Sequence, residues 1–208
     1  NNLLGVTNVS LVHADQHGFV FHPSDANKAV IGNDGGVFYA NNLSEAYFKD
    51  DAIEARNKEY NVTQFYHGDI GQSVSNPIFL SGAQDNGTQV IDGASAGVNA
   101  SKDLYGGDGA YSFIDKDGEY VIVSYVYNNM RRVNLPLVLL NPDVPLYDGV
   151  EIGEDSNSGK FINPAELDDE LDILYTNASS GGKDSIARYT DIKTANPVRT
   201  NLGSPFLN

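Results

Sequence analysis

The sequence of 208 residues predicts an all-β fold of short antiparallel strands. Three observations support this prediction. β-branched or aromatic runs recur along the chain, clusters of Gly, Asn, Asp and Pro separate these runs, and long amphipathic helical patterns are missing. The runs that we expect to form strands are residues 19–21, 29–31, 37–39, 77–80, 88–91 and 120–123.

Two stretches of the chain favour helix instead. The first is residues 44–59, and the second is residues 164–171. The second stretch fits a single helical turn, in which Asn163 is the N-cap and Pro164 takes the first helical position, where its missing N–H costs nothing. Neither stretch is long enough to suggest a fold of alternating strands and helices.

A loose internal repeat becomes visible when the strands are aligned. Its best copy, residues 17–39, has the order strand, Pro/Asp turn, strand, Gly-rich turn, strand. Similar units follow at a spacing of about 45 residues, the length of a four-stranded propeller blade. A β-sandwich also has short strands and regular turns, but the recurring order favours a β-propeller. We therefore expect one propeller fragment, residues 1–208, with four blades at approximately 12–63, 64–107, 108–158 and 159–208.

Composition and charge exclude several classes of function. The chain has 28 acidic and 13 basic residues and a net charge of -15, which disfavours nucleic acid and anionic membranes as partners. It has no cysteine, which excludes disulfides, thiolate nucleophiles and thiolate metal sites. No apolar run is long enough to span a membrane. Because the chain has no initiator Met, we expect the remaining blades of a larger chain among its partners.

Several motifs resemble those of bacterial secreted propellers of the BNR/Asp-box class, which includes sialidase-like, xyloglucanase-like and sortilin-like members. The motifs are residues 12–17, the Pro23 turn, and residues 32–37, 64–66, 82–88 and 106–109. The Asp-box itself, Ser-x-Asp-x-Gly-x-Thr-Trp, is absent after Tyr39, and Tyr47 stands near the place of its aromatic residue. No arginine matches the triad with which sialidases bind a substrate carboxylate.

The resemblance implies a secreted or cell-surface bacterial protein that binds a polysaccharide or a cell-surface glycan. If the protein is an enzyme, the resemblance implies a glycoside hydrolase with paired aspartates. The sortilin-like members imply the alternative, a non-catalytic propeller that binds protein or serves as a scaffold. No cofactor is required for either function. Calcium is a candidate because oxygen-rich loops such as residues 155–158 suit a hard cation.

The candidate binding residues gather at one face of the expected blades. In a blade, the start of the first strand and the turn between the second and third strands share one face, and turns on a rigid scaffold often hold ligands. Amides, carboxylates and hydroxyls suit neutral polyhydroxylated ligands. The predicted substrate-binding residues are His13, Asp15, His17, Asn33, Gln64, Tyr66, Gln84, Asp85 and Asn86.

Three of these residues, His13, Asp15 and His17, alternate with a period of two. In a strand, all three side chains would point the same way. They could bind a metal ion, or the carboxylate could orient a histidine as general base. Alternatively, all three could bond to neighbouring turns and hold the blade together. The sequence leaves these alternatives, and the presence of a metal, open.

The catalytic candidates are Asp34 and Asp108. A glycosidase needs two carboxyl groups about 5–5.5 Å apart for retention or about 6.5–9.5 Å apart for inversion. Asp34 lies in Asn-Asp-Gly-Gly and Asp85 in Gln-Asp-Asn-Gly, and we expect both turns to require a positive φ. Because Asx residues favour such turns on their own account, a turn-forming role is the alternative for both residues.

Overall fold

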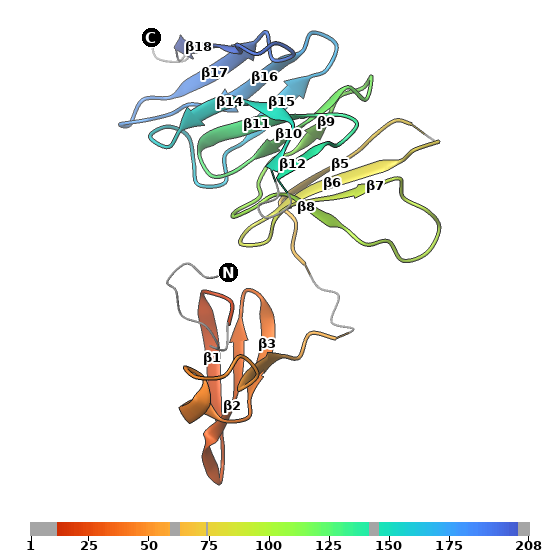
Figure 1. The fold of residues 1–208 in the computed structure, drawn as a ribbon. Coiled ribbons are helices and arrows are strands. Elements are labelled where there is room, and N and C mark those ends of the chain that lie inside the picture. The colour runs from red at the N-terminus through yellow and green to blue at the C-terminus, as the bar shows by residue number, and fades with distance from the viewer. Residues whose placement is uncertain (1–11, 59–62, 74, 142–145, 204–208) are drawn as a thin grey trace. The chain divides into compact units, whose positions relative to one another are not determined.

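The computed structural model describes residues 12–58, 63–73, 75–141 and 146–203. The chain divides into two compact units, Asn1–Thr63 and Gln64–Asn208, and each unit is described by itself. Apart from one short 3-10 helix, all regular structure in the described residues is β-strand (Figure 1). No helix in this part of the chain has the length and apolar character needed to cross a bilayer.

The first unit is one antiparallel sheet whose four strands follow their sequence order (Figure 1). The strands are β1 (Gln16–His22), β2 (Asp25–Asn33), β3 (Gly36–Ala40) and β4 (Ile53–Ala55), and the 3-10 helix η1 (Leu43–Glu45) connects the last two. Ile31 and Phe38 are paired across β2 and β3, and both are buried.

The second unit contains three four-stranded antiparallel sheets. The first sheet consists of β5 (His67–Ile70), β6 (Ile78–Ala83), β7 (Gly87–Asp92) and β8 (Lys102–Tyr105). The second consists of β9 (Phe113–Ile114), β10 (Tyr120–Ser124), β11 (Asn128–Asn134) and β14 (Gly149–Asp155). The third consists of β15 (Ala165–Asp168), β16 (Ile173–Asn177), β17 (Ser185–Thr190) and β18 (Val198–Gly203).

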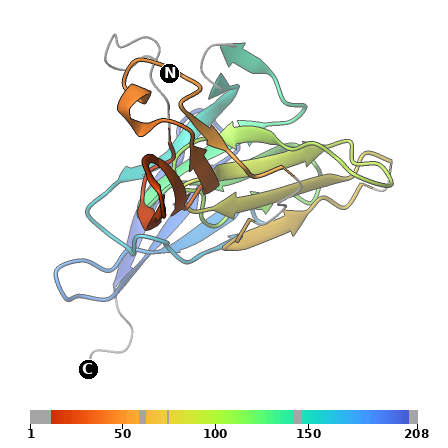
Figure 2. The same ribbon diagram turned by 90° about the horizontal axis from the view of Figure 1, so that it is seen from below.

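A small hairpin, β12 (Leu139–Asn141) and β13 (Leu146–Tyr147), is inserted between β11 and β14. No helix covers the sheets of the second unit in its described residues (Figures 1 and 2).

The three sheets of the second unit are held together by two apolar cores, one on each face of the middle sheet. Strand β10 shows how this works, because its side chains alternate between the two faces. Val121 and Val123 belong to the core shared with Leu80 of the first sheet. Tyr120 and Ile122 belong to the core shared with the third sheet, which includes Leu174, Ala187 and Tyr189. All residues of β10 are buried, as expected for a strand that is covered on both faces.

Sheets of four consecutive antiparallel strands, packed face to face through alternating side chains, are the blades of a β-propeller. The predicted fold class is therefore confirmed: the described residues are all-β and form four four-stranded antiparallel sheets, three of which pack face to face within the second unit. The runs expected to form strands lie in β1, β2, β3, β6, β7 and β10, with Pro77 directly before β6.

Both helical expectations are wrong. Residues 44–59 contain only the end of η1 and the strand β4 in their described part. Residues 165–168 form the edge strand β15, which pairs with β16 from Ala165 and Thr176 onward. Asn163 does not act as a helix cap, since its side-chain amide donates to Asn128 Oδ1 and to the carbonyl of Asn177, both at 2.9 Å. Pairing with a distant strand thus overrides the local capping signal.

Candidate functional site

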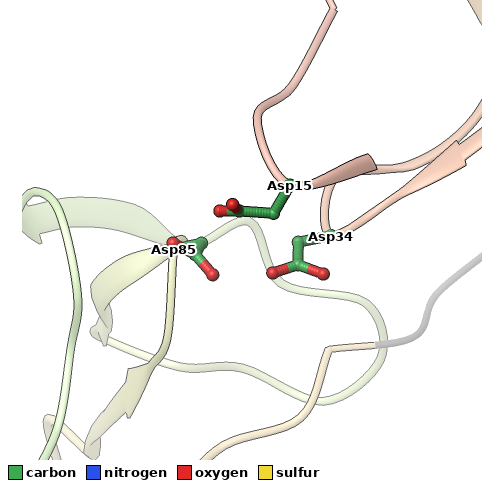
Figure 3. A group of neighbouring side chains, drawn as sticks. All are labelled: Asp15, Asp34 and Asp85. Carbon is green, nitrogen blue, oxygen red and sulfur yellow. The ribbon is translucent and has the colours of Figure 1, made fainter. Parts of the chain in front are cut away.

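The first unit brings together five of the predicted site residues at one end of its sheet: His13, Asp15, His17, Asn33 and Asp34. Asp15 lies directly before β1, and Asp34 lies in the turn between β2 and β3 (Figure 3). The two aspartates each offer a carboxylate oxygen within 4.8 Å of the other. The imidazole Nε2 of His17 contacts Oδ1 of Asp34. A histidine and two carboxylates therefore share this end of the sheet.

The expected alternation of His13, Asp15 and His17 along a strand is wrong, because β1 begins only at Gln16. Asp15 has a φ of 55° and bends the chain before the strand starts. The ring of His13 lies against Gly35, where any Cβ would overlap it. His17 alone of the three lies in the strand, so the three side chains do not form one row.

The turn that carries Asp34 is held by two asparagines. The side chain of Asn33 accepts a hydrogen bond from the N–H of Gly35 at 3.0 Å. Asn57 donates to the carbonyl of Gly35 at 2.7 Å and accepts from the N–H of Val37 at 2.8 Å. Asn33 is therefore a turn-forming residue, and Asn57 was not predicted because it lies outside any motif. This turn has the expected positive φ, and the residue that adopts it is Gly36 (φ 109°).

In the second unit, the residues around β5 and the β6–β7 turn form another group. The hydroxyl of Tyr66 donates to Oε1 of Gln84, and the N–H of Tyr66 donates to the carbonyl of Gly82 at 2.8 Å. The amide of Asn86 donates to the carbonyl of Gln84 at 3.0 Å. Gln64 precedes β5 and is exposed. The side chains of Tyr66 and Asn86 are also exposed, so a ligand can reach this group.

Asp85 and Asp108 are joined in the second unit. Asp85, drawn in Figure 3, has a φ of 59°, as expected for its turn. Its N–H donates to Oδ1 of Asp108 at 3.1 Å. The half-buried carboxylate of Asp108 therefore stabilises the β6–β7 turn through this hydrogen bond. Asp34 belongs to the first unit and Asp108 to the second.

Backbone contacts fix the loop around Asp108 against the same turn. The N–H of Gly109 donates to the carbonyl of Ala83 at 2.8 Å, and the N–H of Gly87 donates to the carbonyl of Gly107 at 2.8 Å. A Cβ on Gly109 would overlap the carbonyl oxygen of Gly87. The last glycine of the Gly-Gly-Asp-Gly motif is thus explained by the close approach of two backbones, and Gly107 by its positive φ of 82°.

The connections between the sheets of the second unit lie at the same end as the turns between their second and third strands. The N–H of Ala110, between β8 and β9, donates to the carbonyl of Ser124 at the end of β10 at 3.3 Å. The segment between β14 and β15 touches two turns, because Tyr127 N–H donates to the carbonyl of Phe161 at 3.0 Å and Gly159 N–H donates to that of Ser179 at 2.9 Å. The polar turns of three sheets therefore share one end of the unit.

A buried network that the sequence did not reveal supports this end. The side chain of Asn128 is completely buried. Its amide donates to Ser158 Oγ at 2.8 Å and to the carbonyl of Asn177 at 2.9 Å. Its oxygen accepts from Asn163 at 2.9 Å and from Thr176 at 2.6 Å. Two donated and two accepted bonds satisfy the amide and tie the second sheet to the third.

An ion pair lies beside this network. Arg199 Nη1 donates to Asp155 Oδ2 at 2.7 Å, and the hydroxyl of Ser158 donates to the same oxygen at 2.5 Å. These bonds to the charged form, first that of Ser158 and then that of Arg199, lower the pKa of Asp155 to about 2. Asp155 belongs to the oxygen-rich loop, residues 155–158, that the sequence suggests for calcium. In the structure a guanidinium already faces its carboxylate.

Two hollows lie on the third sheet and its loops. One, of about 410 Å³, lies between the β14–β15 connection and the β16–β17 turn and is lined by Asn157, Gly159 and residues 179–184. The other, of about 400 Å³, lies along the sheet and includes Tyr175 and Ile186. Neither was predicted, because their walls come from segments that no single motif connects.

Comparison with known proteins adds little to this picture. No family model matches the chain, and no curated protein sequence matches it. Among solved structures, the chain is similar to the Cps50 (Swd1) β-propeller domain of Myceliophteria thermophila, with a TM-score of 0.47 and 11% identity over 93% of this chain and 62% of that chain. It is also similar to an ancestral GH74 enzyme, with a TM-score of 0.41 and 11% identity over 93% of this chain and 26% of that one.

The chain therefore spans less than two thirds of the length of either structure. Its assignment to the β-propellers rests on its own strand order and sheet packing.

Proposed function

We propose that the chain is part of a secreted or cell-surface bacterial propeller that binds a neutral polysaccharide or cell-surface glycan. The observation that supports this proposal is the set of polar side chains on the turns at one end of the second unit. The Tyr66–Gln84 pair is its central part, because it joins a hydroxyl and an aromatic ring directly before β5 to an amide in the β6–β7 turn. Sugar hydroxyls donate and accept hydrogen bonds, and amides and hydroxyls can do both.

The net charge of the chain favours neutral glycans over acidic ones. A charge of -15 repels polyanions such as uronic-acid polymers. A neutral glycan meets no such repulsion, and the ring face of a tyrosine gives it an apolar surface against which to pack. The proposal is therefore restricted to uncharged sugar chains.

The binding proposal is tested by isothermal titration calorimetry of the full chain with cellohexaose and mannohexaose, and with hexagalacturonate for comparison. We expect a neutral hexasaccharide to bind. Tyr66→Ala should weaken this binding by about tenfold, since one lost polar and stacking contact corresponds to about 1.4 kcal/mol. Tyr47→Ala, which removes an exposed tyrosine from the first unit, is the control and should leave the affinity unchanged.

Absence of binding to every neutral oligosaccharide would overturn the proposal and favour the protein-binding alternative. Preference for hexagalacturonate would overturn the restriction to neutral chains.

Hydrolysis of the bound glycan is a second candidate function, and one observation favours it. Asp34 has both an imidazole partner, His17, and a second carboxylate, Asp15, within 4.8 Å. Glycoside hydrolysis needs two carboxyl groups that flank the scissile bond, and Asp15 and Asp34 place two carboxyl groups at the same end of one sheet. Release of reducing ends from the bound hexasaccharide tests this function separately from binding.

A further inference from the structure

We propose that the hollow between the β14–β15 connection and the β16–β17 turn holds one sugar unit of the glycan, and that the ring of Phe161 stacks on a neighbouring unit. This inference rests on the proposed function and locates a binding subsite that the sequence motifs did not include. The hollow, here called the hairpin subsite, is lined by Asn157, Gly159 and residues 179–184. Its volume of about 410 Å³ lies within the range of about 300–1,000 Å³ that ligand pockets have.

One wall of the hairpin subsite is the tight turn between β16 and β17. Ser180 and Lys183 exchange two backbone hydrogen bonds of 3.0 Å. The two residues between them, Gly181 (φ 58°) and Gly182 (φ 76°), have the positive φ values of a type I′ turn. A Cβ on either glycine would meet nothing within 4 Å. The absence of side chains at these two positions therefore leaves room for a ligand.

The opposite wall is held in a fixed position. The hydroxyl of Ser180 donates to the carbonyl of Asn157 at 2.8 Å, which joins the turn to the connection. The N–H of Asn157 donates to Asp155 Oδ1 at 2.9 Å, and Asp155 is bound by Arg199. A wall that is ordered before the ligand arrives loses little conformational entropy on binding.

The side chains around the hollow suit a neutral polar ligand. Asn157 carries an amide that can donate and accept, Lys183 carries a donor and Asp184 an acceptor. The charges of Lys183 and Asp184 are opposite, so the lining has no excess of either sign. The hydroxyls of a hexose unit donate and accept, so they are chemically suited to all three side chains.

The aromatic part of the site lies on the same connection. Phe161 is 43% exposed and packs edge-on against Tyr127, with ring centroids 6.1 Å apart. Tyr127 has a φ of 59°, which is unfavourable for a bulky residue. Its N–H donates to the carbonyls of Lys160 and Phe161 at 3.2 and 3.0 Å, which holds this backbone in place. The structure thus keeps an exposed ring fixed two residues from Gly159.

The experiment uses one variant that fills the hollow and one that removes the ring of Phe161, and each variant has a matched control. Gly182→Asn adds a side chain to a residue that lines the hollow, and Asn tolerates the positive φ of this position. Gly118→Asn is its control, since Gly118 also has a positive φ (70°) and open space, but lies in the turn between β9 and β10. Phe161→Ala removes the ring, and Phe48→Ala is its control, since Phe48 is 69% exposed and also packs edge-on against a tyrosine.

Binding of cellotetraose and mannotetraose to the full chain is measured by calorimetry, after thermal unfolding has shown which variants fold. We expect Gly182→Asn and Phe161→Ala to weaken binding of the tetrasaccharide by about tenfold or more, and both controls to bind like the parent chain. If Gly182→Asn does not fold, Lys183→Met serves in its place, because it removes a lining donor at an exposed position.

The experiment distinguishes failure of the hairpin subsite from failure of the proposed function. A parent chain that binds the tetrasaccharide, together with subsite variants that bind equally well, would overturn the hairpin subsite and leave the proposed function standing. A parent chain that binds no neutral oligosaccharide would overturn both.

Discussion

The guanidinium of Arg199 in β18 bonds to the carboxylate of Asp155 at the end of β14, with Nη1 and Oδ2 2.7 Å apart. This contact joins the last strand of one sheet to the last strand of the next. It also supports the segment that carries Asn157, because the same carboxylate accepts from the N–H of that residue. The ion pair is therefore part of the support of the polar end of the second unit.

We expect the contribution of Asp155 to stability to depend on pH. Its pKa is about 2 in the folded chain and about 3.9 when unfolded, so the folded state favours the charged form. The stabilisation is then complete well above pH 4 and is lost as the pH falls toward 2. Asp155→Asn should lower the free energy of unfolding by about 1–2 kcal/mol at pH 7 and by much less at pH 2, as measured by urea denaturation.

The control for this measurement is Glu54→Gln, which removes the exposed partner of Arg56 in the first unit. An exposed pair is expected to contribute little at either pH. An equal loss of stability for Asp155→Asn at pH 7 and at pH 2 would contradict the prediction.

A second prediction concerns the buried amide of Asn128. Asn128→Ala leaves Ser158, Asn163 and Thr176 without their shared partner and opens a cavity between two sheets. Because buried polar groups without partners are costly, we expect a loss of about 3 kcal/mol in the free energy of unfolding of the second unit. Asn134→Ala, on the same strand, removes a single bond to Asp148 and should cost about 1 kcal/mol. Equal losses in the two variants would speak against a special role of the network.

A third prediction concerns the contact between Gly109 and Gly87. A Cβ at position 109 would overlap the carbonyl oxygen of Gly87, and backbone cannot move aside as a flexible side chain can. Gly109→Ala should therefore destabilise the second unit by about 2–3 kcal/mol in thermal or urea unfolding. Gly203→Ala, where a Cβ meets nothing within 4 Å, should be neutral. A neutral Gly109→Ala would show that the two loops can separate without cost.

The hydrolytic function makes a fourth prediction, on the two predicted catalytic residues. Asp34→Asn and Asp108→Asn keep an oxygen acceptor, so the contact from His17 and the bond from the N–H of Asp85 can persist. Loss of a catalytic carboxylate typically lowers the rate by about 100-fold or more, while binding remains. Reducing-end release by each variant, compared with calorimetric binding, measures the two effects separately. Variants that hydrolyse at the parent rate would remove these residues from the catalytic set.

Six strands, β1, β2, β3, β6, β7 and β10, were predictable because their signals are local, whereas β4 and β15 lie in stretches that the sequence favours as helix. The runs that became β2, β6 and β10 are apolar and β-branched, and Pro23 and the pair Gly35–Gly36 mark turns of the first sheet. These features depend on residues a few positions apart, and the sequence shows them directly. Blade-sized repetition follows from the same signals, repeated along the chain.

The structure of the candidate site was less predictable, because its contacts join distant segments. Asn163 has the sequence of a helix cap, but it bonds to Asn128 and Asn177, 35 and 14 residues away. The partnership of Asp85 with Asp108 spans 23 residues. Neither contact leaves a periodic or motif signal.

The sequence by itself thus determined the fold class, the strand order and the polar character of the turns, since local propensity and turn chemistry decide these properties. Only the tertiary structure decided which polar side chains hold the fold and which remain open to a ligand. Asn33 bonds to the backbone of its own turn and Asp108 to that of the β6–β7 turn, whereas Tyr66 and Asn157 remain exposed. The physical reason is that a buried polar group must find a partner, and packing between sheets determines which partner is near.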